Sequence, residues 1–456
     1  MNKTDKYSLV DGSIGGKLFF VALPLIGTQI IQMAYNLTDM FWLGRLGSDS
    51  VAASGTVGLF LWLSMAFMLF GRMGAEIGVS QNLGRGDRER ALSFVRTSII
   101  VSIALGVIIA LVYRYGRSAL VGLFNIQEPN VEQDAKDYLA IISIGVPFSF
   151  LASAISGIFS GAGNTRISLI INGIGLALNM LLDPILIFNA DMGIQGAAVA
   201  TVIAQATAAC LSLLALFRYK SRPFEIIGLL KRIDTQVLKQ IFVWVTPVSV
   251  ESFLFTFLSM IIAALITTYG AGAMAASRVS TQIESLNWLI AGGFGSALTT
   301  FTGQNYGAGK WERIHRGFKI SSWLMVCWGV LLTLFFYFGG RAIFGLFIPN
   351  DPAVVDIGVQ YLRTMALIQI PSCLEGVAAG IFRGQGKTVP PSVSSVTVNA
   401  LRVVLAFLLS RYTSLGLAGI WIAIAAGAGT RGACVYIWYL FYNKKIKKLS
   451  FFSQNV

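Results

Sequence analysis

Long apolar segments alternate with short polar ones along the whole chain. Twelve can be drawn, at about 17–43, 50–80, 91–114, 136–161, 166–189, 194–218, 240–268, 273–302, 317–340, 357–383, 389–410 and 416–442. Each is long enough to cross a hydrocarbon core about 30 Å thick. They lack the alternation of barrel strands and are far too long for it. The pattern predicts an all-α polytopic membrane protein with twelve transmembrane helices.

Composition and charge agree with this prediction. Of the 456 residues, 55% are hydrophobic and 12% charged, with a mean hydropathy of +0.70, whereas a soluble protein carries about 25% charged residues. The net charge of +14 would suggest a nucleic-acid partner in a soluble chain. Here the Lys and Arg residues cluster in the loops of one side and at both ends. We therefore expect a multi-pass protein of the cell membrane, with the bilayer and no nucleic acid as partner and both termini in the cytoplasm.

The chain contains an internal repeat at a constant offset of 223 residues. Pro24 falls on Pro247, and QNLGRGDRER (81–90) falls on QNYGAGKWER (304–313). Each half holds six helices, so both enter the membrane in the same orientation. Two six-helix bundles related by a parallel repeat are typical of transporters that rock about a central site. We predict an N-terminal lobe at 1–217, a cytoplasmic connector at 218–239 and a C-terminal lobe at 240–456.

One stretch of the repeat, GIFRGQGKT (380–388), resembles a nucleotide-binding loop. Its first glycine is one residue too early for that pattern. The equivalent GIFSGAGNT (157–165) has Asn164 where the lysine would be, so duplicated architecture explains both stretches better. An enzyme is also disfavoured, because the single histidine, His315, and four scattered cysteines form no catalytic pair, and we expect neither a cofactor nor a structural metal.

Several stretches resemble the multidrug and toxic compound extrusion (MATE) transporters. They follow one another in the order typical of that family, and the turn motifs among them occur in both halves of the chain. They are GRLGSDSVAASG (44–55), RVSTQIES (278–285) and the paired QNxGxG and GIFxGxGxT turns. The resemblance covers essentially the whole chain and implies two lobes around a central cavity. It also implies export of small amphipathic, often cationic compounds, driven by inward proton or sodium flow. An acid in the first segment with an Asn and an Asp in the fifth is similar to the DinF-like branch. A monomer suffices for this architecture.

Polar residues on the first and fifth segments mark the expected coupling site. Two polar faces follow from helical spacing. The first carries Gln32, Tyr35, Asn36 and Asp39, and the second Asn172, Asn179 and Asp183. Two carboxylates facing each other in a poorly solvated cavity resist double ionisation, so one can take up and release a proton. We expect Asp39 to carry the coupling ion, a proton or alternatively Na⁺ held by Asp39 and Asp183, with Asp183 and Asn179 as its partners. A hydrogen-bonded pair that only joins two helices is the alternative.

The substrate cavity is expected to adjoin these faces. Its candidate residues are Gln32, Met33, Tyr35, Asn36, Asn172 and Met180.

The second half lacks the acidic cluster of the first. Asp39 and Asp183 fall on Ile262 and Ala406, and Asn179 on Arg402. Conversely, three glutamates occur only in the second half: Glu251, Glu284 and Glu375. They could attract a cationic substrate or hold a second cation, or be paired with Arg278 or Arg402. A lipid-linked precursor flippase is the alternative function, with Arg278, Arg402 and Arg431 as its only diphosphate-binding candidates.

Overall fold

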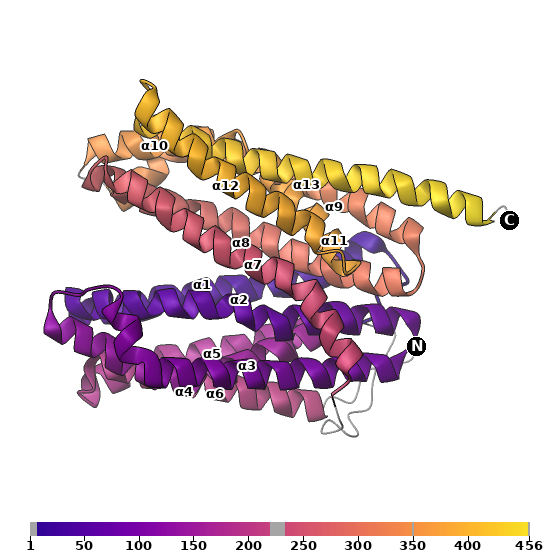
Figure 1. Ribbon diagram of the computed structural model, residues 1–456, viewed down its shortest axis with the longest axis horizontal. Helices are drawn as coiled ribbons and strands as arrows, with labels where there is room; N and C mark the ends of the chain where they lie inside the picture. The colour runs from indigo at the N-terminus through magenta and orange to yellow at the C-terminus, as the bar shows by residue number, and fades with distance from the viewer. Residues whose placement is uncertain (1–6, 219–232, 349–350, 455–456) are drawn as a thin grey trace. The chain divides into compact units, whose positions relative to one another are not determined.

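The structure is a computed structural model that describes residues 7–218, 233–348 and 351–454 (Figure 1). Within those ranges every regular element is a helix. They are α1 (Ile14–Leu46), α2 (Ser48–Arg85), α3 (Arg88–Gly122), α4 (Pro129–Gly161), α5 (Thr165–Pro184), the π-helix η2 (Ile185–Asn189), α6 (Gly193–Arg218), α7 (Thr235–Thr267), α8 (Ala271–Gly307), α9 (Trp311–Phe347), α10 (Pro352–Ala366), α11 (Gln369–Gly384), α12 (Val389–Tyr412) and α13 (Leu417–Gln454). The predicted all-α class is confirmed.

Most of these helices can span a bilayer. Among the described residues ten are long and apolar enough, and the bent pair α10 and α11 gives an eleventh. The 37 residues of α8 are also long enough, but Arg278, Glu284 and other polar residues lower its hydropathy. Counting α8 gives the twelve predicted spans.

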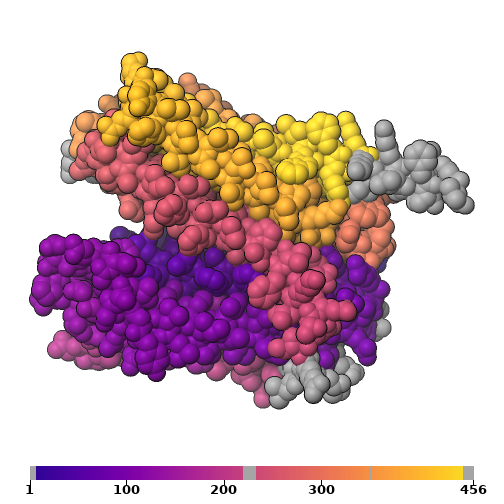
Figure 2. All heavy atoms as spheres, viewed as in Figure 1, coloured from indigo at the N-terminus to yellow at the C-terminus, as the bar shows by residue number. Residues whose placement is uncertain are grey.

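The chain divides into two compact units, which are described separately. Unit 1 comprises Met1–Ser249 and Gly303–Gly309, and unit 2 comprises Val250–Thr302 and Lys310–Val456. The lobe boundaries drawn from the sequence stay a prediction, and most of the predicted connector, residues 219–232, lies outside the described residues. In Figure 2 the visible face of unit 2 includes α12, in orange to yellow. Its Leu401 and Val404 are 61% and 55% exposed, as expected of side chains that meet lipid.

Paired glycines allow the repeated turns to approach each other within unit 1. A Cβ atom on Gly84 would lie 2.0 Å from the Gln304 carbonyl oxygen, and one on Gly307 would lie 1.9 Å from that of Gln81. The two contacts are related by the 223-residue offset. The neighbouring Gly86 caps α2 with φ 80°, whereas Gly84 and Gly307 allow the close backbone contact.

Gln304 and Asn305, from the second QNxGxG turn, also form hydrogen bonds with Leu9 near the N-terminus. Gln304 Oε1 accepts a hydrogen bond from the Leu9 amide at 2.9 Å, and its Nε2 donates to the Gly161 carbonyl at 3.1 Å. Asn305 Nδ2 donates to the Leu9 carbonyl at 3.2 Å. The GIFxGxGxT stretch therefore ends a helix and takes part in this junction; in the described residues no strand leads into it.

The segment predicted as one span at 357–383 is broken, which corrects that prediction. α10 and α11 meet at 52°. Gln369 stabilises the break, because its Nε2 donates to the Met365 carbonyl at 2.9 Å and its Oε1 accepts from Asn287 of α8 at 2.8 Å. In the first half, Pro184 precedes the π-helix η2, consistent with the loosened helix expected there.

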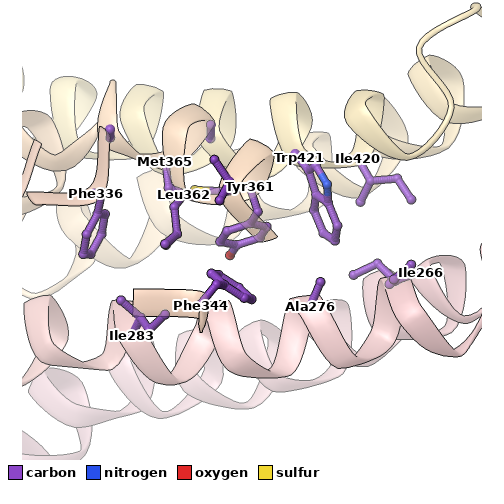
Figure 3. Close-up of a cluster of buried hydrophobic side chains, with 14 of the residues drawn as sticks. Ile266, Ala276, Ile283, Phe336, Phe344, Tyr361, Leu362, Met365, Ile420 and Trp421 are labelled. Atoms are coloured by element: carbon purple, nitrogen blue, oxygen red, sulfur yellow. The ribbon is translucent and has the colours of Figure 1, made fainter. Parts of the chain in front are cut away.

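Each unit has its own apolar interior. In unit 2, side chains of α7, α8, α9, α10 and α13 pack together, including Ile283, Phe344 and Trp421. Figure 3 shows Tyr361 within this cluster, with its hydroxyl oxygen directed toward the helix that carries Ala276 and Ile283. The interior is therefore interrupted by a polar group, which needs a partner.

Candidate ion and substrate site

Asp183 and Asn179 lie at the centre of the polar site in unit 1. Both are fully buried on α5, one helical turn apart. Asn179 Nδ2 donates to Asp183 Oδ1 at 3.1 Å. This leaves Asp183 Oδ2 and Asn179 Oδ1 buried without a hydrogen-bond partner in the described part of the chain.

Asp39 reaches the same site from α1, which packs against α5. Its Oδ1 is likewise buried and unpartnered among the described residues. The packing of α1 on α5 brings the two carboxyls within electrostatic reach of each other, and no hydrogen bond joins them in the described structure. One bound proton would satisfy two of these three acceptor oxygens, and a cation with oxygen ligands could engage all three.

Two tyrosines and α6 complete the site. Tyr35 Oη donates to Thr201 Oγ1 at 2.8 Å. Tyr138 of α4 lies near enough to Asp39, Tyr35 and Asp183 to interact electrostatically with all three. Gln205, one turn beyond Thr201, has a buried Oε1 without a partner among the described residues. Sequence reasoning missed Tyr138, Thr201 and Gln205; only Tyr138 left a signal, since Tyr361 matches it in the repeat.

The polar face predicted on α1 is divided in the structure. Tyr35 and Asp39 are partly buried and belong to the site, whereas Gln32 and Asn36 are exposed. Met33 is half-buried. The polar face of α1 is wider than the part of α1 that contacts the site. Gln32 and Asn36 lie at the edge of this face and therefore outside the site.

On α5 the predicted substrate residues also lie outside the buried centre. Asn172 is half-buried, and its Nδ2 donates to the Ser168 carbonyl of its own helix at 2.8 Å. Met180 is 42% exposed. Their assignment to a substrate cavity stays a prediction.

The three glutamates of unit 2 each have a partner. Glu251 Oε2 accepts from Ser392 at 2.7 Å, and Glu284 Oε2 accepts from Tyr361 at 2.9 Å. Glu375 forms an ion pair with Arg431 Nε at 2.8 Å. The partner of Glu375 is thus Arg431, and the pairing with Arg278 or Arg402 considered from the sequence is not formed there. Arg278 is exposed and Arg402 buried.

Both halves of the chain match the same protein family. The profile of the MatE family matches residues 24–185 and again 247–408, two stretches offset by the same 223 residues. The chain belongs to the MatE family. The family predicted from the sequence is thereby confirmed, while the DinF-like branch stays a prediction.

Curated relatives of this MatE chain match it over almost its full length. The "Probable multidrug resistance protein NorM" of Thermotoga maritima is 28% identical over 434 residues, covering 93% of this chain and 92% of the relative. The "Probable multidrug resistance protein YoeA" of Bacillus subtilis is 25% identical over 446 residues, covering 95% of each.

Solved MATE structures share the fold. A crystal structure of MATE in the bent conformation gives a TM-score of 0.92 at 21% identity, over 99% of both chains. An outward-facing multidrug resistance MATE family transporter of the MOP superfamily gives 0.89 at 20% identity, over 98% of this chain and 99% of that one. The architecture of twelve helices in two repeats is therefore that of MATE transporters.

Proposed function

We propose that this protein is a secondary active multidrug exporter of the cell membrane. It moves small amphipathic, often cationic compounds outward in exchange for inward-moving protons, through alternating access of its two lobes. The names of the full-length relatives support the export of drugs. The observation that carries the coupling mechanism is the set of buried, unpartnered oxygens on Asp39, Asp183 and Asn179.

A proton suits this site because one proton satisfies two acceptors. A carboxyl that gains a proton becomes a donor and can bond a neighbouring oxygen. When the proton leaves, two carboxylates remain close together in a poorly solvated interior, which is unfavourable. Uptake and release therefore change how α1 packs against α5, and this change is the proposed link to lobe movement.

Sodium is the second candidate for the same site. Carboxylate and amide oxygens are hard ligands of the kind that such cations prefer. Asp39, Asp183 and Asn179 each offer one unused oxygen, and the buried Gln205 Oε1 on α6, also without a partner among the described residues, is a further acceptor to test.

The flippase alternative is less well supported. A diphosphate requires several unpaired basic residues, yet Arg431 is paired with Glu375 and Arg278 is exposed. Only Arg402 remains as a buried guanidinium without an ion-pair partner among the described residues.

The test is export from proteoliposomes that contain a fluorescent cationic dye. A pH gradient and a sodium gradient are imposed separately. The proposal predicts that the pH gradient drives dye movement in the absence of sodium. Movement with only the sodium gradient would replace the proton by Na⁺, and dye movement indifferent to both gradients would refute antiport.

A further inference from the structure

Arg402 is a buried cation at a position where the first repeat has an amide. It lies on α12 and is 8% exposed. The repeat places it opposite Asn179, since 402 and 179 differ by 223. Unit 1 therefore has a neutral donor among carboxylates there, and unit 2 has a guanidinium.

Few of the N–H donors of Arg402 have a hydrogen-bond partner in the described structure. Nη2 donates to Ser259 Oγ at 3.3 Å, which is long for a charged donor. Its Nε is buried, and within the described part of the chain Nε has no hydrogen-bond partner and Arg402 forms no ion pair. Arg431 is the contrast, because its buried guanidinium is paired with Glu375. Only one of these two arginines has a counter-ion in contact.

Glu284 is the acid that acts on Arg402, but Tyr361 holds it. Glu284 lies within electrostatic reach of Arg402, yet its Oε2 accepts a hydrogen bond from Tyr361 Oη at 2.9 Å. The Tyr361 ring packs edge-on against Trp421 at 4.8 Å between centroids, and Figure 3 shows the two side by side. Packing thus fixes the tyrosine that bonds Glu284, and within the described residues Glu284 forms no ion pair with Arg402.

The fold also makes room for the arginine. A Cβ atom on Gly427 of α13 would lie 2.9 Å from both Cγ and Cδ of Arg402. The first repeat has Ala204 at the equivalent position. On its other side the guanidinium lies 5.5 Å from the centroid of the Phe255 ring. Arg402 is thus a buried charge with unused N–H donors, its aliphatic chain packs against Gly427, and an aromatic ring lies beside its guanidinium. These are features of an anion-binding site.

We propose that Arg402 binds the carboxylate of zwitterionic amphipathic compounds. Its planar fork suits a carboxylate, and the Phe255 ring offers an apolar face for the rest of the molecule. Glu284 lies nearby as a like charge and weakens the binding of the carboxylate. This inference deepens the proposed export function and rests on it for transport, whereas the binding itself can be measured independently.

The experiment compares two dyes that differ in one group, a rhodamine with a free carboxylate and its methyl ester. Binding to the purified full-length protein is followed by fluorescence anisotropy. Arg402→Gln should raise the Kd of the acid roughly 10- to 100-fold, as expected for one charge-assisted hydrogen bond, and leave that of the ester within about twofold. Glu284→Gln should tighten binding of the acid alone.

Two further variants separate recognition from folding. Arg341→Gln removes an exposed arginine that is paired with Asp356 and should leave the acid-to-ester ratio unchanged. Arg402→Lys keeps the charge without the fork, so it should give an intermediate ratio even if Arg402→Gln does not fold.

The inference is overturned if the wild type does not bind the acid, or if the Arg402 variants weaken acid and ester equally. Selective binding of the acid without export of either dye would leave this site in place and refute the exporter instead.

Discussion

Asn179 is the residue that holds the carboxyl of Asp183 in a defined orientation. It has no exposed surface, and its amide donates to Asp183 Oδ1. A buried carboxylate costs several kcal/mol unless it is hydrogen-bonded or neutralised. Asp183 receives one bond from Asn179 and has one oxygen unsatisfied, so its charge state is sensitive to any ion that enters.

Replacing Asn179 by Leu should therefore impair coupling. Asn179→Leu keeps the volume but removes the donor, and the gradient-driven rate of dye export should fall by roughly 10-fold, as for loss of one hydrogen bond to a charged group. The matched control is Asn399→Leu. Asn399 is 3% exposed, and its amide bonds Ser395 of its own helix. Equal rates in the two variants would remove Asn179 from the coupling site.

The sequence predicted the acids but not all of their surroundings. Asp39 and Asp183 stand out because charged residues are rare in apolar segments. Tyr138 and Thr201 do not, since tyrosine and threonine are ordinary on membrane helices. Which edge of the α1 stripe faces inward depends on how α1 and α5 are rotated against each other, and that is set by packing along their whole length.

At the scale of helices, glycines set how closely the elements of each unit pack. A Cβ atom on Gly157 of α4 would lie 2.1 Å from the Arg72 carbonyl oxygen of α2. The equivalent Gly380 of α11 would meet the Gly295 carbonyl of α8 at 2.4 Å. Small residues at such crossings allow close backbone approach in membrane proteins. The GIFxGxGxT motif is thus explained by helix packing in both repeats.

Gly157→Ala should destabilise the protein. The added methyl forces α4 away from α2, and overpacking of this kind costs about 1–3 kcal/mol. Gly58→Ala is the control, because a Cβ there meets nothing within 4 Å, and alanine favours a helix by about 1 kcal/mol over glycine. Thermal unfolding of the detergent-purified variants should show a lower Tm for Gly157→Ala only. A Tm unchanged from wild type would mean that the crossing is not tight.

The break between α10 and α11 shows why helix boundaries were harder to predict than helices. Residues 357–383 are apolar enough as a whole that hydropathy indicates one span. The interruption depends on Gln369, which caps Met365 and bonds Asn287. Asn287 is 82 residues away in the chain, so the sequence around Gln369 does not predict its hydrogen bond with Asn287.

For the whole molecule, the charge distribution predicts the orientation in the membrane. The loop after α3 contains Glu128, and the loop before α9 contains Lys310. Basic loops remain in the cytoplasm, so the two loops should lie on opposite sides.

Cysteine labelling checks this orientation in a background in which Cys210, Cys327, Cys373 and Cys434 are replaced. In intact cells, Gln127→Cys should react with a membrane-impermeant maleimide. Lys310→Cys should react only after the membrane is permeabilised. The reverse result would invert the topology and with it the direction of transport.

The proposed exchange requires one ion site to serve the whole molecule. Among the described residues, only the first repeat has the unpartnered acidic cluster, while the glutamates of the second repeat accept hydrogen bonds or an ion pair. Coupling should therefore depend on unit 1, even though the proposed cycle moves both lobes.

The most direct measurement is gradient-driven efflux of a fluorescent cationic dye from proteoliposomes, compared between wild type and Asp39→Asn. The account predicts that the pH gradient drives the wild type and that the folded variant shows no gradient-driven efflux, because an amide cannot exchange a proton. If Asp39→Asn still couples dye movement to the gradient, the ion is carried elsewhere. Glu251, Glu284 and Glu375 would then replace Asp39 as the coupling residues.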